Sequence, residues 1–530
     1  MRRKTITGFA ALIIILFSLC LNAQVYDTLN INNVNARFSS KGILSWNGGG
    51  LPDPEPILFE IPNGSGKHTI WSSEIWFAGI DMNEVLHIAA HEERESSELW
   101  EGPVADTYDS EYSDNYNKIY KINKSEIDDH IANWNTGGYI IPSSIAGWPA
   151  HGDTSNGEAF YLAPFFDYND DDIYNPENGD YPEIRGDQAL FLILNDDRDE
   201  HLTTDGEKLK IEIHMMAYSY STSGCLNDVI FVNYEIYNRS SDNYHDCYVG
   251  IFGDFDIGLY SDDYAGCDPD RNTFFGYNGD NMDGNGTGGT YGDEPPAQGI
   301  TFLSSPMTSY INFDMEYSNT TGYPVDGDEF YNYMKAIWRD GTHLQFGGTG
   351  HLSGGNETNF AYPEGSGWTE VTEGHVPTER RGIGALGPFN LISGEHICFD
   401  IAYTWAFAVP GKAYESVGAL QDSVDCVQAF YDSQGYDCPE IIHIVIEENI
   451  ENTGSRINIY PNPTDGVITI DSEGIEIEKT EIYNLLGSQV RSYNKQSGQI
   501  DISDLKNGIY IIKICEKNGF PVKYEKVVKN

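Results

Sequence analysis

The sequence has 530 residues, of which 31 are Lys or Arg and 82 are Asp or Glu, giving a formal net charge of −51 at pH 7. A protein this acidic repels nucleic acids and anionic membrane surfaces, so we exclude both as partners. The sequence contains no GxSxG nucleophile motif, no P-loop and no protein-kinase motif set, so none of these enzyme classes is indicated.

Residues 1–23 are typical of a signal peptide. Basic residues at positions 2–4 precede an apolar run over residues 9–21, and the segment LNA at residues 21–23 offers a cleavage site before Gln24. The run is too short to span a bilayer comfortably, and no second apolar stretch follows it. We therefore expect export of the chain and no transmembrane segment in the mature protein.

The negative charge is concentrated between Gln24 and Ser455. The first 23 residues hold three basic residues, and the segment from Arg456 onward holds ten residues of each sign, which leaves 18 basic and 72 acidic residues between them. Such a body repels itself unless cations lie among its carboxylates, and calcium is the candidate outside a cell. The alternative is an acidic surface that binds only water.

Strand patterns dominate this body and predict an all-β protein. Residues 211–220, 229–237 and 247–252 alternate apolar and polar side chains between Gly, Asn, Asp or Ser turns, which favours antiparallel sheets packed as sandwiches with few helices. The length suggests an N-terminal β-rich subdomain over residues 24–160 and a main body over residues 161–446.

The strongest candidate site is the acidic loop from Asp167 to Asp180. Asp167, Asn169 and Asp171 occupy positions one, three and five of a calcium loop, and the carbonyl of Ile173 falls at position seven. Position twelve is Asn178 instead of Glu, so Glu177 or Asp180 would have to complete the coordination. We predict a structural calcium site here; an Asp/Asn-rich turn without metal is the alternative.

A second acidic region follows the predicted strand at residues 247–252. Its carboxylates belong to Asp254, Asp256, Asp262, Asp263 and Asp268. Such a cluster either binds a cation or supplies two carboxylates for acid–base catalysis, and we favour the cation.

Three other patterns are weak. His87 and His91 have the spacing of a zinc pair, but Ile88 replaces the Glu of a metalloprotease. The GxGxxG match at residues 284–289 follows no strand and opens no helix, so it predicts a turn. Tryptophans beside Gly or Pro could stack on sugars, although core packing is the commoner use of each one.

The body ends in a predicted helix. Val417, Leu420, Val424, Val427 and Phe430 recur at helical spacing before Gly435, a typical C-terminal stop. Among six body cysteines, which allow 15 pairings, we favour a disulfide between Cys426 and Cys438. The polar residues 447–455 read as a linker.

Residues 456–530 form a separate module. Seven runs rich in Ile, Val and Tyr alternate with turns, which predicts a small Ig-like antiparallel β-sandwich. The motifs are RINIYPNP at 456–463, IYNLLG at 482–487, LKNGIYIIK at 505–513 and KVVK at 526–529. The segment resembles the type A C-terminal sorting domain of the type IX secretion system of Bacteroidetes. The matching positions are Pro461, Asn462, Pro463, Gly466, Gly487, Gly508, Tyr510, Lys526 and Lys529.

That resemblance implies a removable address read by the type IX secretion machinery, and a protein that is secreted or held at the outer cell surface. The body is also similar to uncharacterised exported proteins of Bacteroidetes, through IWFAGID at 75–81, WEGP at 100–103, YPEIRGDQ at 181–188 and SDDYAGC at 261–267. This second likeness implies a shared β-fold and no activity.

The sequence thus predicts a calcium-stabilised β-sandwich protein with an adhesion, surface-structure or glycan-binding role. The alternative is a secreted polysaccharide hydrolase that uses carboxylates of the acidic loops.

Overall fold

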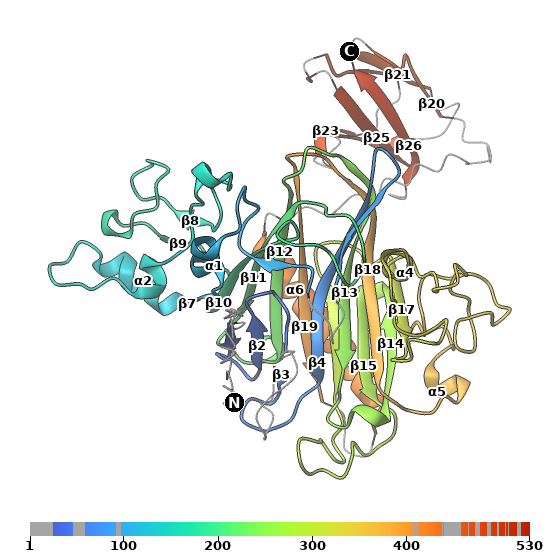
Figure 1. Ribbon diagram of the computed structural model, residues 1–530. Coiled ribbons are helices and arrows are strands. Elements are labelled where there is room, and N and C mark those ends of the chain that lie inside the picture. Colours follow the sequence, from blue (N-terminus) through green and yellow to red (C-terminus); the bar gives the residue numbers. More distant parts are fainter. Residues whose placement is uncertain are drawn as a thin grey trace, which may run out of the picture.

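The computed structural model (Figure 1) describes residues 25–45, 59–91, 97–407, 412–436, 438 and 457–529, the last range with gaps at 465, 472–476, 485–488, 495–497, 504, 507 and 517–520. The predicted signal peptide, the linker at residues 447–455 and Gly487 lie outside the described residues. Two large antiparallel sheets form the body, which confirms the predicted all-β class.

The first large sheet has five strands in the order β17-β18-β13-β4-β5. Their bounds are Ser309–Phe313, Arg380–Leu391, Tyr244–Phe255, Ile70–Asp81 and Leu86–Ala89. The second sheet has nine strands in the order β14-β15-β16-β19-β12-β11-β10-β6, with β7 also pairing with β10. Their bounds are Asp263–Asp268, Thr273–Asn278, Ala297–Phe302, His396–Ala406, Val229–Asn238, Ile211–Ser219, Gln188–Asn195, Trp100–Glu101 and, for β7, Tyr120–Asn123.

Alternation along each strand places one face of both sheets in a shared core. In β11, for example, Ile211, Ile213 and Met215 join the same buried cluster as Trp76 of β4 and Ile251 of β13. Successive side chains of a strand point to opposite faces, so the intervening residues of β11 lie on the outer face of the nine-stranded sheet.

Strands from both sides of residue 160 share these sheets. Strand β4 pairs with β13, and β6 and β7 both pair with β10. The two subdomains predicted from chain order therefore contribute to common sheets.

The remaining elements of the body are short. A three-stranded sheet contains β1, β2 and β3, and a two-stranded sheet contains β8 and β9; their bounds are Tyr26–Leu29, Asn35–Ser39, Phe59–Glu60, Phe165–Phe166 and Tyr181–Pro182. Helices α1 to α5 span Ser110–Tyr116, Lys124–Asn133, Ser143–Ala146, Gly327–Tyr333 and Glu370–Glu373. Short 3₁₀ helices η1 to η5 span Thr154–Asn156, Pro176–Asn178, Cys225–Asp228, Tyr260–Asp262 and Pro269–Arg271.

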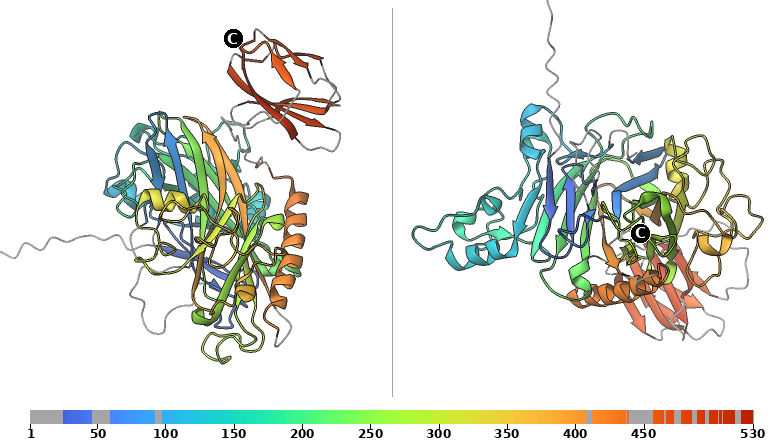
Figure 2. Two further views of the ribbon diagram at one scale, coloured as in Figure 1. Left: turned by 90° about the vertical axis from the view of Figure 1, so that its right-hand side faces the viewer. Right: turned by 90° about the horizontal axis from the view of Figure 1, so that it is seen from below.

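Two segments cover the outer face of the nine-stranded sheet. The lobe that contains α1, α2, β8 and β9 projects beside β10 in Figure 1, and the long helix α6 (Glu415–Gln434) lies along the strands in Figure 2. One buried cluster joins Trp148 of the lobe, Phe191 of β10 and Val427 of α6. A cleft lies on this outer face, between the lobe and strands β10 to β12.

Helix α6 confirms the periodicity in the sequence. Val417, Leu420, Val424 and Val427 are buried, and the helix ends at Gly435, which adopts a left-handed conformation with φ of 65°. A residue with positive φ at this position favours glycine because a Cβ atom is sterically costly there.

The predicted disulfide was wrong in its partners. Cys426 bonds with Cys225, and Cys438 bonds with Cys398. Because α6 continues past Cys426 to Gln434, eight residues of helix carry the chain about 12 Å away. Disulfide Cα atoms lie within about 7 Å, so Cys438 instead reaches β19.

The Cys225–Cys426 bond ties α6 to η3 across 201 residues of chain. Its removal by paired Ser substitutions is expected to lower the free energy of unfolding by about 2–4 kcal/mol, because the unfolded chain regains loop entropy. Urea unfolding of the body measures this loss. The Cys398–Cys438 pair, which spans 40 residues, provides the comparison and should cost less; equal stability of both double variants and the parent would contradict this account.

The C-terminal module is the predicted small sandwich of seven strands. One sheet has the order β20-β21-β24, with bounds Asn458–Tyr460, Val467–Asp471 and Gly498–Asp501. The other has the order β23-β22-β25-β26, with bounds Gln489–Asn494, Ile477–Asn484, Gly508–Glu516 and Pro521–Lys529. Isoleucines of both sheets, among them Ile468 and Ile512, form its own core.

The motif positions of this module have structural roles. Asn462 accepts a hydrogen bond from the backbone N–H of Val528 at 2.9 Å, which joins the Pro461–Pro463 turn to β26. Gly466 has φ of 129°, and a Cβ atom there would meet Ser503. Tyr510 is buried, and its hydroxyl donates to the Lys506 carbonyl at 2.8 Å. Gly508 pairs with Lys529, and Lys526 lies in β26.

Candidate functional site

The predicted calcium loop is braced by its own backbone. Asp180 is fully buried, and its two carboxylate oxygens accept N–H groups of Tyr168 at 2.9 Å and Asn175 at 2.7 Å. Asp167 accepts from the N–H groups of Asn169 and Asp172 in the same way.

Asp171 completes this pattern. Its side chain accepts from the Ile173 N–H at 2.9 Å and from the Asn169 amide at 2.9 Å. Within the described residues, Asp167, Asp171 and Asp180 do not place ligand oxygens within 4.8 Å of one another. Local hydrogen bonds hold this loop, and calcium here stays a prediction.

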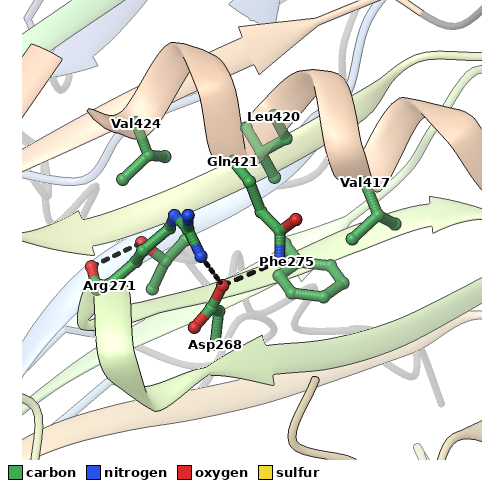
Figure 3. A pocket seen from close by; sticks show the side chains of 8 residues that line it. Asp268, Arg271, Phe275, Val417, Leu420, Gln421 and Val424 are labelled. Carbon is green, nitrogen blue, oxygen red and sulfur yellow. Dashed lines mark hydrogen bonds and ion pairs between the residues drawn. The ribbon is translucent and has the colours of Figure 1, made fainter. Parts of the chain in front are cut away.

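The second acidic region is divided between different partners. Asp254 is fully buried and forms an ion pair with Arg381, whose Nε and Nη2 both lie 2.9 Å from Oδ2. Asp268 accepts from Arg271 Nη1 at 2.9 Å and from Gln421 Nε2 at 2.8 Å, beside a cavity of only about 10 Å³ under α6 (Figure 3). Asp254 and Asp268 thus hold strands and helix together. They do not form an open acid–base pair.

Asp256 and Asp263 are also buried. Asp263 accepts from the Ile257 N–H at 2.9 Å, and Asp262 accepts from the Gly284 N–H at 3.2 Å. None of the five carboxylates predicted in this region lines the larger hollows of the described surface.

A cleft of about 420 Å³ lies on the outer face of the nine-stranded sheet. Its floor comes from β10, β11 and β12, and its wall from the lobe. The floor residues are Phe191, His214, Met216, Asn233, Glu235 and Tyr237, and the wall residues are 161–165, Asp167, Asp172 and Glu183. The pattern of the strands explains the floor, since β11 and β12 place apolar residues inward and these residues outward.

A charged network orients His214 on this floor. Its Nε2 lies 2.9 Å from Glu212 Oε1, which also accepts from Arg239 Nη2 at 2.6 Å. The second oxygen of Glu212 accepts from the Val104 N–H at 3.0 Å. Burial alone would raise the pKa of Glu212, but His214 and Arg239 hold it below its ordinary value. Glu212 is therefore a carboxylate that fixes the His214 ring.

Tyr237 is the aromatic centre of the floor. Its hydroxyl donates to Glu235 Oε2 at 2.6 Å, and its ring stacks on His396 with centroids 4.8 Å apart. The Arg239 guanidinium lies 4.4 Å from its centroid, and the His214 ring lies 4.7 Å away. Burial and the Glu235 carboxylate raise the pKa of Tyr237, so its hydroxyl stays protonated at neutral pH.

Aromatic rings also line the wall. Tyr161 is 54% exposed, and its ring lies 4.8 Å from that of Phe160, which stacks on His151 at 4.3 Å. Phe165 lies edge-on to His151 at 5.3 Å. An exposed aromatic ring beside fixed polar groups suits a sugar ring. The apolar face of the sugar can stack on the aromatic ring, and the hydroxyl groups at its edge can bond with the polar groups.

Sequence reasoning missed this cleft, although β11 and β12 carried a signal. Glu212, His214, Asn233, Glu235 and Tyr237 occupy alternate positions of strands whose intervening residues are mainly apolar. Polar residues are unusual on a sheet face that other elements cover. Their presence here indicates the part of the outer face that the lobe and α6 leave open.

Most of the tryptophans considered as sugar contacts are in the core. Trp76 and Trp368 are each less than 2% exposed and Trp148 is buried, whereas Trp100 is partly exposed. His87 and His91 do not form a pair; His87 lies 3.7 Å from Asp81 and His91 lies 3.8 Å from Glu74.

A second hollow, of about 290 Å³, lies beside the five-stranded sheet. Trp338, Tyr362, His375 and Arg380 contribute to its lining. Glu370 neutralises Arg380 through two contacts of 2.7 and 2.9 Å. This second hollow is smaller than the cleft and serves below as the alternative place for a bound sugar.

The C-terminal module matches a known family. Residues 458–530 match the secretion system C-terminal sorting domain, which confirms the resemblance seen in the motifs. The protein is therefore secreted or located at the outer surface through the type IX machinery. In the part of the chain that the structure describes, no helix has the length and apolar character needed to cross a membrane.

Similarity to other characterised proteins is partial. An ulvan lyase, NLR42 of Nonlabens ulvanivorans, is 34% identical over 68 residues, which is 12% of this chain and 13% of that protein. The solved structure of a polysaccharide lyase aligns with 60% of this chain and 34% of its own, at a TM-score of 0.19 and 9% identity.

Proposed function

We propose that this secreted protein binds neutral polysaccharide chains in the cleft between the lobe and strands β10 to β12. The observation that carries the proposal is the combination of an exposed aromatic wall at Tyr161 with oriented polar groups at His214, Glu235 and Tyr237. The cleft volume is in the range typical of sites that enclose small ligands. Glycan binding of this kind fits an adhesion or surface role.

The charge of the cleft favours neutral glycans. Four carboxylates, those of Asp167, Asp172, Glu183 and Glu235, line it, and Arg239 beside Tyr237 is already paired with Glu212. Sulfated or uronate-rich chains would be repelled by this arrangement.

Cleavage of the bound chain is a second candidate function. The pair of His214 and Glu212 favours it, because a histidine held by a carboxylate is a typical general base. Glu235, which lies opposite His214 on β12, is then the second carboxyl group available for acid–base catalysis. The acid–base residues of the hydrolase alternative would thus lie on this floor and not among Asp254 to Asp268.

A polysaccharide array tests both functions. The purified mature protein is expected to bind to the neutral polysaccharides of the array. It should not bind to the sulfated or uronate-rich ones, because of the carboxylates in the cleft. Released reducing ends, measured in the same reactions, separate cleavage from binding: turnover that is lost in His214→Ala supports the second function. Retention of polyanionic chains alone would contradict the proposed ligand class.

A further inference from the structure

We propose that a calcium ion binds where strand β14 begins and strand β15 ends, between Asp262, Asp263 and Asn278. This site is independent of the glycan cleft and would stabilise the edge of the nine-stranded sheet. It differs from the set of ligands that the sequence suggested, since Asp254 and Asp268 are committed to Arg381, Arg271 and Gln421.

The strand register brings two of these residues together. Asp263 is the first residue of β14 and lies directly opposite Asn278, the last residue of β15. Side chains at opposed positions of antiparallel strands share a face, with Cβ atoms about 4.5–5.5 Å apart. Asp262 precedes β14 as the last residue of η4.

In each of the three residues one polar side-chain atom is hydrogen-bonded and one side-chain oxygen has no partner. Asp263 Oδ2 accepts from the Ile257 N–H, the Asn278 amide donates to the Asp280 carbonyl at 2.7 Å, and Asp262 Oδ2 accepts from the Gly284 N–H. Asp263 Oδ1, Asn278 Oδ1 and Asp262 Oδ1 are buried and have no hydrogen-bond partner among the described residues.

Orphaned oxygens of this kind are costly, so they point to a bound group. Asp263 is fully buried and Asn278 is 1% exposed. Leaving a buried acceptor unsatisfied costs about 1–3 kcal/mol, and more for a charged one. Three such oxygens close to one strand end are the observation from which we infer a bound cation.

The surrounding charge is also unbalanced. The carboxylates of Asp256 and Asp283 act on Asp263 together with that of Asp262, and burial and these charges raise the pKa of Asp263. Asp283 is itself buried, where it accepts N–H groups of Leu259 and Tyr291. Lys67 is the basic group that acts on Asp283. A divalent cation would offset the remaining negative charge.

The donor chemistry favours calcium over other metals. Carboxylate and amide oxygens are hard ligands, and no His or Cys side chain belongs to the set, which disfavours zinc and copper. Calcium accepts irregular oxygen shells of six to eight ligands, whereas magnesium demands near-octahedral geometry. Three side-chain oxygens from a strand end and a loop suit the less demanding ion.

Calorimetric titration of the full mature protein with calcium, after removal of metal by EGTA, tests the site. Asp263→Asn and Asn278→Leu are expected to weaken calcium binding by roughly tenfold or more. Asp268→Asn, in the same strand, is the control and should retain the parent affinity, and Asp171→Asn examines the other acidic loop separately. Binding lost in Asp171→Asn but kept in Asp263→Asn would overturn the assignment, as would no binding by the parent.

Thermal unfolding supplies a second readout with opposite signs. In EGTA, Asp263→Asn should melt at or above the temperature of the parent, because it removes a buried carboxylate that lacks a counter-charge. In millimolar calcium, it should melt below the parent. An equal calcium-induced shift in both proteins would contradict the proposal.

Discussion

Arg381→Ala is expected to lower the free energy of unfolding by about 3–5 kcal/mol, because it leaves the buried Asp254 carboxylate without its counter-ion. Arg381 is 2% exposed and Asp254 is fully buried. The two residues face each other near the end of β13 and the start of β18, in the five-stranded sheet. Chemical denaturation of the variant and the parent measures the loss.

A matched double variant separates the ion pair from simple loss of packing. Arg381→Met combined with Asp254→Leu removes both charges and keeps apolar volume, so it should recover much of the stability lost in Arg381→Ala. A single variant as stable as the parent would contradict the role assigned to the pair. A double variant as unstable as the single one would assign the loss to packing.

Local patterns in the sequence were enough to predict the fold class and the C-terminal module. Alternation in β11 and β12 and the 3.6-residue period of α6 depend on neighbours in the chain. Strand order does not, and the pairing of β4 with β13 joins segments more than 160 residues apart. For this reason the sequence did not show that residues on both sides of position 160 share the same sheets.

The candidate sites were harder to predict. The sequence shows where the acidic residues are, but it does not show which basic or amide groups they contact in the folded protein. Asp254 is 127 residues from Arg381, and Asp268 is 153 residues from Gln421. Only the folded chain shows that these carboxylates are neutralised, whereas Asp262 and Asp263 retain oxygens without partners. The disulfides are a further example, since Cys426 bonds with Cys225, 201 residues away, and not with Cys438.

Tyr161→Ala is expected to weaken binding of a neutral oligosaccharide roughly tenfold to hundredfold, as truncation of an aromatic anchor commonly does. The ring is exposed on the cleft wall and packs against Phe160, so its removal takes away stacking area with little effect on the core. Isothermal titration with the oligosaccharide selected from the array measures the change in Kd.

Tyr317→Ala is the matched control for this experiment. Tyr317 is a comparably exposed tyrosine, and it does not belong to the lining of the cleft. Its replacement should leave the affinity unchanged. Equal affinities of the Tyr161 variant and the parent would show that the wall of the cleft is not part of the binding site.

The most direct test of the glycan-binding account is a crystal structure of the mature protein with a bound neutral oligosaccharide. The account predicts sugar rings against Tyr161, with hydroxyl groups bonded to Glu235 and His214 on the floor formed by β11 and β12. Sugar density in the second hollow beside Trp338 and His375, with the cleft empty, would contradict it.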